Sequence, residues 1–419
     1  EDGIAWIDES DYYFIKVTNE PESGGLLKRT LVLDNLIHGY FILNHPERLD
    51  YDYEHLYALV AYRAAKQYER ITFNPAEAPK PADAKPSQPA TASADASKKA
   101  ETPADSKAEK GKEQANAKAN DADKSKADSK KPEEPKRDGI PPEEILAGKL
   151  NVKDSKLTTL FLGGGAYTFQ RYMQYVYPGT GVDVAEIDPA VTNANHQATG
   201  LPPDTPIVTY WGDARQFVQK HQGSKQYDLV FGDAFNDFSV PWHLTTREFN
   251  EMINRMLSPT GVYMINIIDV YKSDEQALKD ANIRIEKDNI TDNAAQQRIR
   301  SEAIAEAHRF GGFLGSWTKT ARETFPHVYI FGTDSNPGRG LRETFVVVAC
   351  KQELDLKDLG RRDDDPKFFD RGQRTEPAPL GKADVDQIDL RSRGIILTDD
   401  YAPVENLLAP VAETRADDD

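Results

Sequence analysis

Three consecutive glycines and a later acidic residue carry the first chemical signal in this chain. The apolar run 160–162 leads into Gly163, and a second apolar run, 182–185, ends on Glu186. Glycines let a backbone turn tightly and approach a ligand closely, because no Cβ stands in the way. A carboxylate at the end of the next strand can accept hydrogen bonds from both hydroxyls of a ribose. We therefore expect a nucleoside site formed by Gly163, Gly164, Gly165 and Glu186.

More acidic residues follow the apolar runs further along the chain. Asp188 and Asp213 come after the second and third runs, and Asp233 and Asp237 come after the fourth. Ligands of an open parallel sheet bind beyond the carboxyl ends of its strands, so these side chains are expected to lie close together. Aspartate is also a common cap at the start of a helix. For Asp188 and Asp213 both interpretations, capping and ligand binding, stay open.

The glycine run also limits which nucleoside is expected. It lacks the G-x-G-x-x-G spacing of a dinucleotide fold, and no Lys-Ser/Thr pair of a P-loop follows it, so NAD and ATP are disfavoured. The pattern resembles nucleoside binding by enzymes that use S-adenosylmethionine. This resemblance implies that Glu186 holds the ribose and that Asp213 accepts a hydrogen bond from the adenine amine.

Composition limits the partners and the location. The chain has 419 residues and a formal net charge of −17. Phosphate backbones bind to positive charge, so nucleic acid is not an expected partner. An acidic protein suits a cationic small molecule, although acidity equally serves solubility. Cys350 is the single cysteine, which excludes an intrachain disulfide and a cysteine-based metal cluster, and a reducing, cytoplasmic location is expected.

Targeting and metal signals are absent from the sequence. No apolar run approaches the about 18–20 residues of a membrane span, and no signal peptide is recognisable. The chain starts at Glu1 instead of a methionine, which we interpret as the start of a processed or excised fragment. No His, Asp or Glu spacing typical of a metal site on a helix occurs, so no metal is expected.

The chain divides by composition into three segments. Residues 1–75 are expected to form a small antiparallel β-domain followed by a first helix, with a hairpin turn at 33–36. Residues 76–138 lack aromatic and branched apolar side chains almost entirely and cannot bury enough surface to fold, so a disordered insertion is expected. Residues 139–410 are expected to form the nucleoside-binding domain.

The third segment alternates between strand and helix patterns. This alternation predicts an α/β fold with a mostly parallel, doubly wound sheet whose last two strands form an antiparallel hairpin. A charged, solvated helical insertion is expected at 268–310 and a polar loop at 355–390. Thr245 and Glu248 are expected to cap a helix as a capping box. The strands are expected at 157–162, 181–186, 206–210, 227–232, 261–267, 327–332 and 343–349.

The order of these motifs resembles one enzyme family, the polyamine aminopropyltransferases (spermidine synthases), and more closely their membrane-fused bacterial relatives. Each motif alone is common, but the combined order is specific and covers most of the chain outside 76–138. The resemblance implies a Rossmann-like, methyltransferase-type sheet behind a small β-domain. The motifs that carry it are residues 30–34, 51–57, 162–165, 186–189, 212–214, 227–235 and 397–405.

The resemblance also implies a reaction and roles for individual residues. Such enzymes transfer an aminopropyl group from decarboxylated S-adenosylmethionine, as co-substrate, to a diamine and release methylthioadenosine, without a permanently bound cofactor. Asp233 would act as general base, with Tyr53 and Asp237 positioning the cationic amine. Further substrate contacts are expected from His55, Asp399 and Tyr401. A homodimer, and a membrane domain upstream of this chain, are implied as well.

Three departures from the family pattern keep other interpretations open. Ala166 stands where the family has an aspartate after the glycines, Asn236 stands at the fourth position of its D-x-x-D segment, and Glu54 and His55 are interchanged. An S-adenosylmethionine-dependent methyltransferase is the main alternative, because the same fold serves both. A catalytically weakened polyamine or nucleoside sensor is the other. His243 could carry protons or pack a loop, and Asp399 could bind an amine or stabilise a turn.

Overall fold

A computed structural model describes residues 3–74, 152–234, 240–333, 338–357, 359 and 377–413. Glu1–Asn74 and Ile140–Asp419 belong to one unit, and Pro75–Gly139 form another. The predicted disordered insertion at 76–138 lies outside the described residues, as do Asn236 and Asp237. In the described ranges, no helix combines the length and the apolar character that crossing a bilayer requires.

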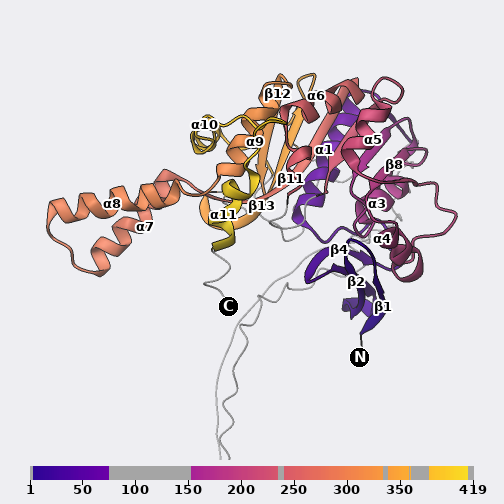
Figure 1. The fold of residues 1–419 in the computed structure, drawn as a ribbon, viewed down its shortest axis with the longest axis horizontal. Coiled ribbons are helices and arrows are strands. Elements are labelled where there is room, and N and C mark those ends of the chain that lie inside the picture. The colour runs from indigo at the N-terminus through magenta and orange to yellow at the C-terminus, as the bar shows by residue number, and fades with distance from the viewer. Residues whose placement is uncertain are drawn as a thin grey trace, which may run out of the picture. The chain divides into compact units, whose positions relative to one another are not determined.

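A seven-stranded sheet forms the centre of the larger segment (Figure 1), with the order β12-β13-β11-β10-β7-β8-β9. The five strands from β7 to β11 pair in parallel, and β13 pairs antiparallel with both β11 and β12. The predicted parallel sheet and its antiparallel hairpin are therefore confirmed. The strands are β7 (Thr158–Leu162), β8 (Gly181–Glu186), β9 (Val208–Trp211), β10 (Tyr227–Gly232), β11 (Leu257–Lys272), β12 (His327–Gly332) and β13 (Arg339–Cys350).

Helices cover both faces of this sheet, because successive residues of each strand point to opposite sides. In β10, Phe231 packs with α1 (Asp52–Gln67) and α3 (Thr168–Val176), whereas the preceding Val230 packs on the other face. That second face carries α5 (Ala214–His221), α6 (Arg247–Met256) and α9 (Gly312–Arg322). The helix predicted after the N-terminal strands is α1, and its apolar side chains Leu56, Leu59, Val60 and Ala64 are buried.

The N-terminal segment forms a four-stranded antiparallel sheet in the order β1-β2-β3-β4. Asp34 adopts a positive φ of 55° in the β3–β4 turn, as the predicted hairpin at 33–36 requires. One face of the sheet packs on Ala166, next to the glycines, and on α4 (Pro189–Ala194). The strand β1 was not predicted. The strands are β1 (Ile4–Glu9), β2 (Phe14–Pro21), β3 (Leu27–Leu33) and β4 (Leu36–Ile42).

Several smaller elements complete the chain, and they confirm one expectation and correct another. The charged stretch at 268–310 contains two paired helices, α7 (Asp274–Lys287) and α8 (Asn293–Ala307), which extend away from the sheet in Figure 1 and confirm a solvated helical insertion. The prediction of a loop at 355–390 is wrong in its last part, because α10 begins at Lys382. The other elements are β5 (Ile71–Phe73), β6 (Val152–Ser155), η3 (Asn195–Thr199), η4 (Trp242–Leu244), α10 (Lys382–Arg391) and α11 (Val404–Glu413).

The expected cap of α6 is wrong by one residue. Thr246 is the capping residue, since its hydroxyl accepts the hydrogen bond from the amide of Phe249 at 3.2 Å. Thr245 instead donates to the carbonyl of Trp242 at 2.7 Å. Glu248 is not part of a capping box, because its carboxylate accepts a hydrogen bond from the amide of Asp399 at 3.0 Å.

A buried arginine of α3 joins the glycine loop to its surroundings. Arg171 is 6% exposed, and its guanidinium donates to the carbonyls of Tyr167 at 3.0 Å and Thr199 at 2.9 Å, and also to that of Ala166. It also lies 3.1 Å from the ring centroid of Phe41 in β4. Burial lowers the pKa of Arg171 well below its usual value. One side chain thus holds the glycine loop, η3 and the N-terminal sheet together.

Replacing this arginine should destabilise the protein more than replacing an exposed one. Arg171→Met removes the guanidinium donors to several buried carbonyls, so the free energy of unfolding should fall by roughly 2–4 kcal/mol in denaturant titrations. The matched control is Arg255→Met on α6, where the lost contact is an exposed hydrogen bond to Gln222. Equal unfolding midpoints for the two variants would show that Arg171 does not hold this junction.

Candidate active site

The carboxyl ends of β7, β8 and β10 bring the glycine loop next to Asp233. The amide of Gly163 donates to Ala185 at 2.9 Å, and the amide of Asp233 donates to Leu162 at 3.0 Å. Gly163 has a φ of +105°, and a Cβ added to it would lie 2.3 Å from the backbone oxygen of Asp233. Glycine is therefore required here both by the backbone conformation and by the close approach of the neighbouring strand.

Glu186 lies against the glycine loop at the end of β8. Its carboxylate accepts hydrogen bonds from the amides of Gly164 at 2.7 Å and Asp188 at 2.9 Å. Burial raises the pKa of Glu186, and the backbone donors oppose this shift. Each carboxylate oxygen can accept a further hydrogen bond, so the predicted contact with a ribose is compatible with this geometry and stays a prediction.

Two side chains that the sequence analysis did not single out shape the loop. Tyr167 is fully buried, and its hydroxyl lies 3.0 Å from the hydroxyls of both Thr192 and Thr209. The side-chain amide of Asn195 donates to the carbonyl of Gly165 at 2.8 Å. These contacts come from α4, η3 and β9, and they hold the loop in one conformation.

Asp233 is held by donors from two distant elements. The hydroxyl of Tyr53 in α1 donates to Oδ2 at 3.2 Å, and the side-chain amide of Asn266 in β11 donates to Oδ1 at 2.9 Å. Burial raises the pKa of Asp233, and these two donors oppose the shift. The structure thus brings the predicted pair of Asp233 and Tyr53 together. The sequence analysis did not identify Asn266. The feature that could have indicated it is a single polar amide within the otherwise apolar strand at 262–267.

Tyrosines and a second carboxyl group lie close to Asp233. The ring centroids of Tyr51 and Tyr53 are 5.3 Å apart, and those of Tyr53 and Tyr57 are 5.5 Å apart. Glu54 is 4% exposed, and its Oε2 has no hydrogen-bond partner. Burial, reinforced by the nearby charge of Asp233, raises the pKa of Glu54 well above its usual value. The sequence analysis noted Glu54 only because Glu54 and His55 are interchanged relative to the family pattern.

Asp188 and Asp213 both cap helices. Asp188 accepts from the first turn of α4 at 2.9 Å and from the hydroxyl of Ser10 at 2.6 Å. Asp213 accepts from the amide of Gln216 in α5 at 2.9 Å, and its second oxygen lies 2.9 Å from Nε2 of His243. His243 therefore packs the loop before α6 against Asp213. A contact of Asp213 with adenine stays a prediction.

The C-terminal candidates point to structural partners instead of Asp233. The carboxylate of Asp399 forms a bidentate pair with Arg215, at 2.8 and 2.5 Å, and accepts from Thr246 at 2.7 Å. Burial would raise the pKa of Asp399, but these hydrogen bonds outweigh it and lower the pKa. Tyr401 is 59% exposed. Of the two interpretations of Asp399, the geometry favours the structural one.

The last candidates lie away from Asp233 or outside the described ranges. His55 donates from Nε2 to the carbonyl of Leu49 at 2.8 Å, so its ring is turned to the loop before α1. Asp237 lies outside the described residues and stays a prediction. Among the residues that the structure places, no group of three or more His, Cys, Asp or Glu side chains is arranged to hold a metal ion.

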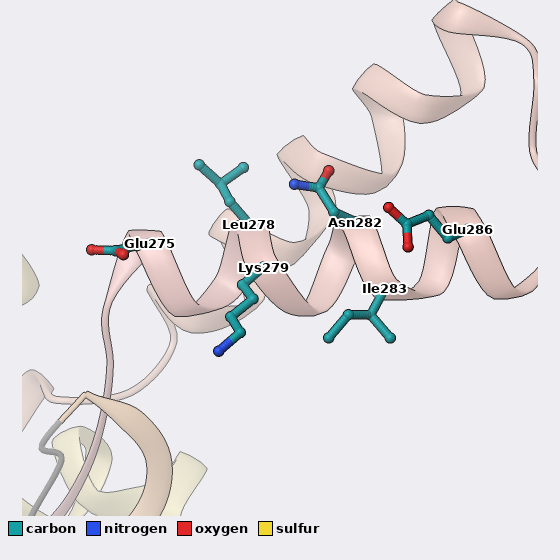
Figure 2. A pocket seen from close by; sticks show the side chains of 6 residues that line it. All are labelled: Glu275, Leu278, Lys279, Asn282, Ile283 and Glu286. Carbon is teal, nitrogen blue, oxygen red and sulfur yellow. The ribbon is translucent and has the colours of Figure 1, made fainter.

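A hollow on α7 is a poor alternative site (Figure 2). All of its lining side chains come from one helix, whereas binding sites combine polar groups that converge from several elements. The hollow lies on the helical insertion, apart from the glycine loop and Asp233. Its lining residues are Glu275, Leu278, Lys279, Asn282, Ile283 and Glu286.

Comparisons with known proteins agree with this arrangement. No family model matches the chain. A "Probable polyamine aminopropyl transferase" of Bifidobacterium longum is 32% identical over 132 residues, which are 31% of this chain and 29% of the relative. A "Polyamine aminopropyltransferase" of Vibrio vulnificus is 35% identical over 130 residues, 30% of this chain and 42% of the relative. Over this segment the chain is similar to polyamine aminopropyltransferases.

The similarity to these aminopropyltransferases is partial, and a solved structure supports the fold. The matched segment spans less than half the length of either curated relative. The crystal structure of a probable spermidine synthase from Corynebacterium glutamicum superposes with a TM-score of 0.53 at 16% identity, covering 95% of this chain and 98% of that one. The predicted Rossmann-like, methyltransferase-type fold with a small N-terminal sheet is confirmed.

The conformation of the glycine loop can be tested by a matched pair of substitutions. Gly163→Ala meets both a positive φ and a backbone clash, whereas Gly223→Ala meets only a φ of +90° with open space around the Cβ. Gly223→Ala should lower the free energy of unfolding by about 1–2 kcal/mol. Gly163→Ala should lower it by roughly 1–3 kcal/mol more, because the strand end must shift. Equal losses in denaturant titrations would contradict the close approach of Asp233.

Proposed function

We propose that this protein is an aminopropyltransferase of the spermidine-synthase type. It would transfer an aminopropyl group from decarboxylated S-adenosylmethionine to a diamine and release methylthioadenosine. The observation that carries the proposal is a partly buried Asp233 beside the glycine loop, held by Tyr53 and Asn266. The names of the curated relatives support the same reaction class.

The reaction requires the protein to align the two substrates and to accept one proton. A C–N bond forms between the acceptor nitrogen and the aminopropyl carbon, the C–S bond of the sulfonium breaks, and a neutral thioether leaves. Asp233 accepts the proton that the nitrogen loses, and a raised pKa makes it a stronger base. Tyr53 and Asn266 hold its two oxygens in a fixed orientation. Asp237 would add a second contact to the amine.

The nucleoside half of the donor would bind at the glycine loop. Glu186 would accept from the ribose hydroxyls and Asp213 from the adenine amine, with the backbone of Gly163–165 close to the ligand. Their positions at the ends of neighbouring parallel strands support this assignment. The proposal includes a homodimer, as the family resemblance implies, and a cytoplasmic location, as the single cysteine led us to expect.

The surroundings of Asp233 favour a decarboxylated donor over S-adenosylmethionine. A methyl donor keeps its amino-acid carboxylate, which would face Asp233 and the buried Glu54 at a loss of electrostatic free energy. A decarboxylated donor and a diamine both present ammonium groups to the same side chains. The described carboxyl groups therefore match cationic substrates better than anionic ones.

Substitution of Asp233 tests the proposed reaction. Methylthioadenosine release from decarboxylated S-adenosylmethionine should depend on added putrescine, and Asp233→Asn should lower kcat by about 10²–10⁴-fold, the usual contribution of a general base. Asp280→Asn, which removes an exposed ion pair with Lys272 on the helical insertion, is the control and should keep full activity. Donor binding without release would support a sensor, and methyl transfer from S-adenosylmethionine would overturn the proposal.

The pH dependence of the reaction tests the role of Asn266. Activity of a general base falls as pH drops through its pKa, and the donor from Asn266 stabilises the charged form of Asp233. Asn266→Leu should therefore raise the pKa of Asp233 and move the acidic limb of the kcat/KM profile to higher pH. An unmoved limb, with the protein folded by circular dichroism, would show that Asn266 does not act on Asp233.

A further inference from the structure

Gln170 of α3 has no role in the reaction described above, yet its side chain reaches the glycine loop. It is 5% exposed, and its Nε2 donates to the carbonyls of Gly163 at 3.2 Å and Gly164 at 3.1 Å. A backbone carbonyl can only accept, so these two partners fix which end of the side-chain amide faces the loop. Gln170 thus holds two successive peptide groups of the glycine loop.

The peptide group between Gly163 and Gly164 connects Gln170 to the predicted ribose ligand. A trans peptide is planar, and its C=O and N–H point in opposite directions. Because the carbonyl of Gly163 is turned to Gln170, the amide of Gly164 points the other way and donates to Oε2 of Glu186 at 2.7 Å. Gln170 therefore sets the orientation of a hydrogen-bond donor that Glu186 receives.

This peptide group needs a partner outside the loop to keep one orientation. Gly163 and Gly164 both lack a Cβ, so the backbone on either side of the peptide permits rotations that other residues resist. Rotation of the peptide would take the amide away from Glu186 and turn a carbonyl oxygen towards its carboxylate, which is electrostatically unfavourable. The hydrogen bond from Gln170 opposes this rotation.

The next carbonyls of the loop are held in the same way from neighbouring positions. Asn195 of η3 is fully buried, its Nδ2 donates to Gly165 at 2.8 Å, and its Oδ1 accepts from the hydroxyl of Thr199 at 2.7 Å. Arg171 donates to the two carbonyls that follow. The five consecutive carbonyls of residues 163–167 thus accept from buried side chains, which determines where the amides of the loop point.

We propose that Gln170 and Asn195 are positioning residues for the nucleoside half of the donor. Gln170 acts through the amide that orients Glu186, and Asn195 acts through the peptide group that follows Gly165. Both act through the backbone of the loop, so they determine how tightly the nucleoside binds and not how fast the aminopropyl group is transferred. The identity of the nucleoside rests on the proposed function.

Substitution of Gln170 separates binding from chemistry. Gln170→Met keeps the length of the side chain but loses its donors, so methylthioadenosine should bind about 5- to 20-fold more weakly in calorimetry, because Glu186 loses its orientation. The KM for decarboxylated S-adenosylmethionine should rise by the same factor, while kcat and the KM for putrescine stay at the wild-type values. A residue that only stabilises the fold would not change one KM alone.

Gln296→Met is the matched control for this variant. Gln296 of α8 also donates from Nε2 to a carbonyl six positions earlier, that of Ile290 at 2.8 Å, but it belongs to the helical insertion. This control should bind methylthioadenosine like the wild type. Unchanged affinity of a folded Gln170→Met, or a fall in kcat with an unchanged KM for the donor, would overturn the inference.

Two further measurements decide the matter where Gln170→Met fails to fold. Asn195→Ala should show the same selective loss of affinity for methylthioadenosine. Hydrogen exchange of the wild type needs no variant: the amides of residues 163–167 should exchange slowly, and methylthioadenosine should slow them little further. Strong slowing by methylthioadenosine would show that the ligand orders the loop in place of these side chains, and would contradict the proposal.

The same measurements distinguish this inference from the proposed reaction. Selective loss of methylthioadenosine binding in the variants, in a protein that transfers no aminopropyl group, would reject the reaction and keep the positioning role. Aminopropyl transfer with an unchanged donor KM in Gln170→Met would do the reverse. If the wild type does not bind methylthioadenosine at all, both are wrong.

Discussion

The arrangement of the candidate site depends on the buried guanidinium of Arg171. Its partners in the described structure are backbone carbonyls, one hydroxyl and the ring of Phe41, so its charge is compensated by dipoles and a π-system. These partners belong to the glycine loop, η3 and β4. Because α1 follows β4 in the chain, this junction also sets where Tyr53 meets Asp233. The N-terminal sheet is thereby part of the site and not an appendage to it.

Local surroundings give chemically equivalent carboxyl groups different roles. Asp399 is surrounded by donors, which lower its pKa and make it a structural anion. Asp233 has two donors and a raised pKa, the combination that suits a base. Glu54 has an oxygen without any donor, and burial raises its pKa well above the usual value. Hydrogen bonds thus outweigh burial at Asp399, whereas burial outweighs hydrogen bonds at Asp233 and Glu54.

Ala166 has a packing explanation. A Cβ added to Gly39 of β4 would lie 2.7 Å from the Cβ of Ala166, so the strand and the loop already touch at this point. A longer side chain at 166 would push the N-terminal sheet away from the loop. Ala166 thus departs from the family pattern at the point where the glycine loop touches the N-terminal sheet.

Alternating apolar patterns and turn residues, which act over short distances, determined the parallel sheet, the hairpin at Asp34 and the positions of Gly163, Glu186 and Asp233 at strand ends. Partners across the fold were decided only by tertiary structure. Tyr53 and Asp233 are 180 positions apart, and Arg215 meets Asp399 across 184. No local pattern encodes such contacts, so the donors of Asp233 and the isolation of Glu54 arise only once α1 packs on the sheet.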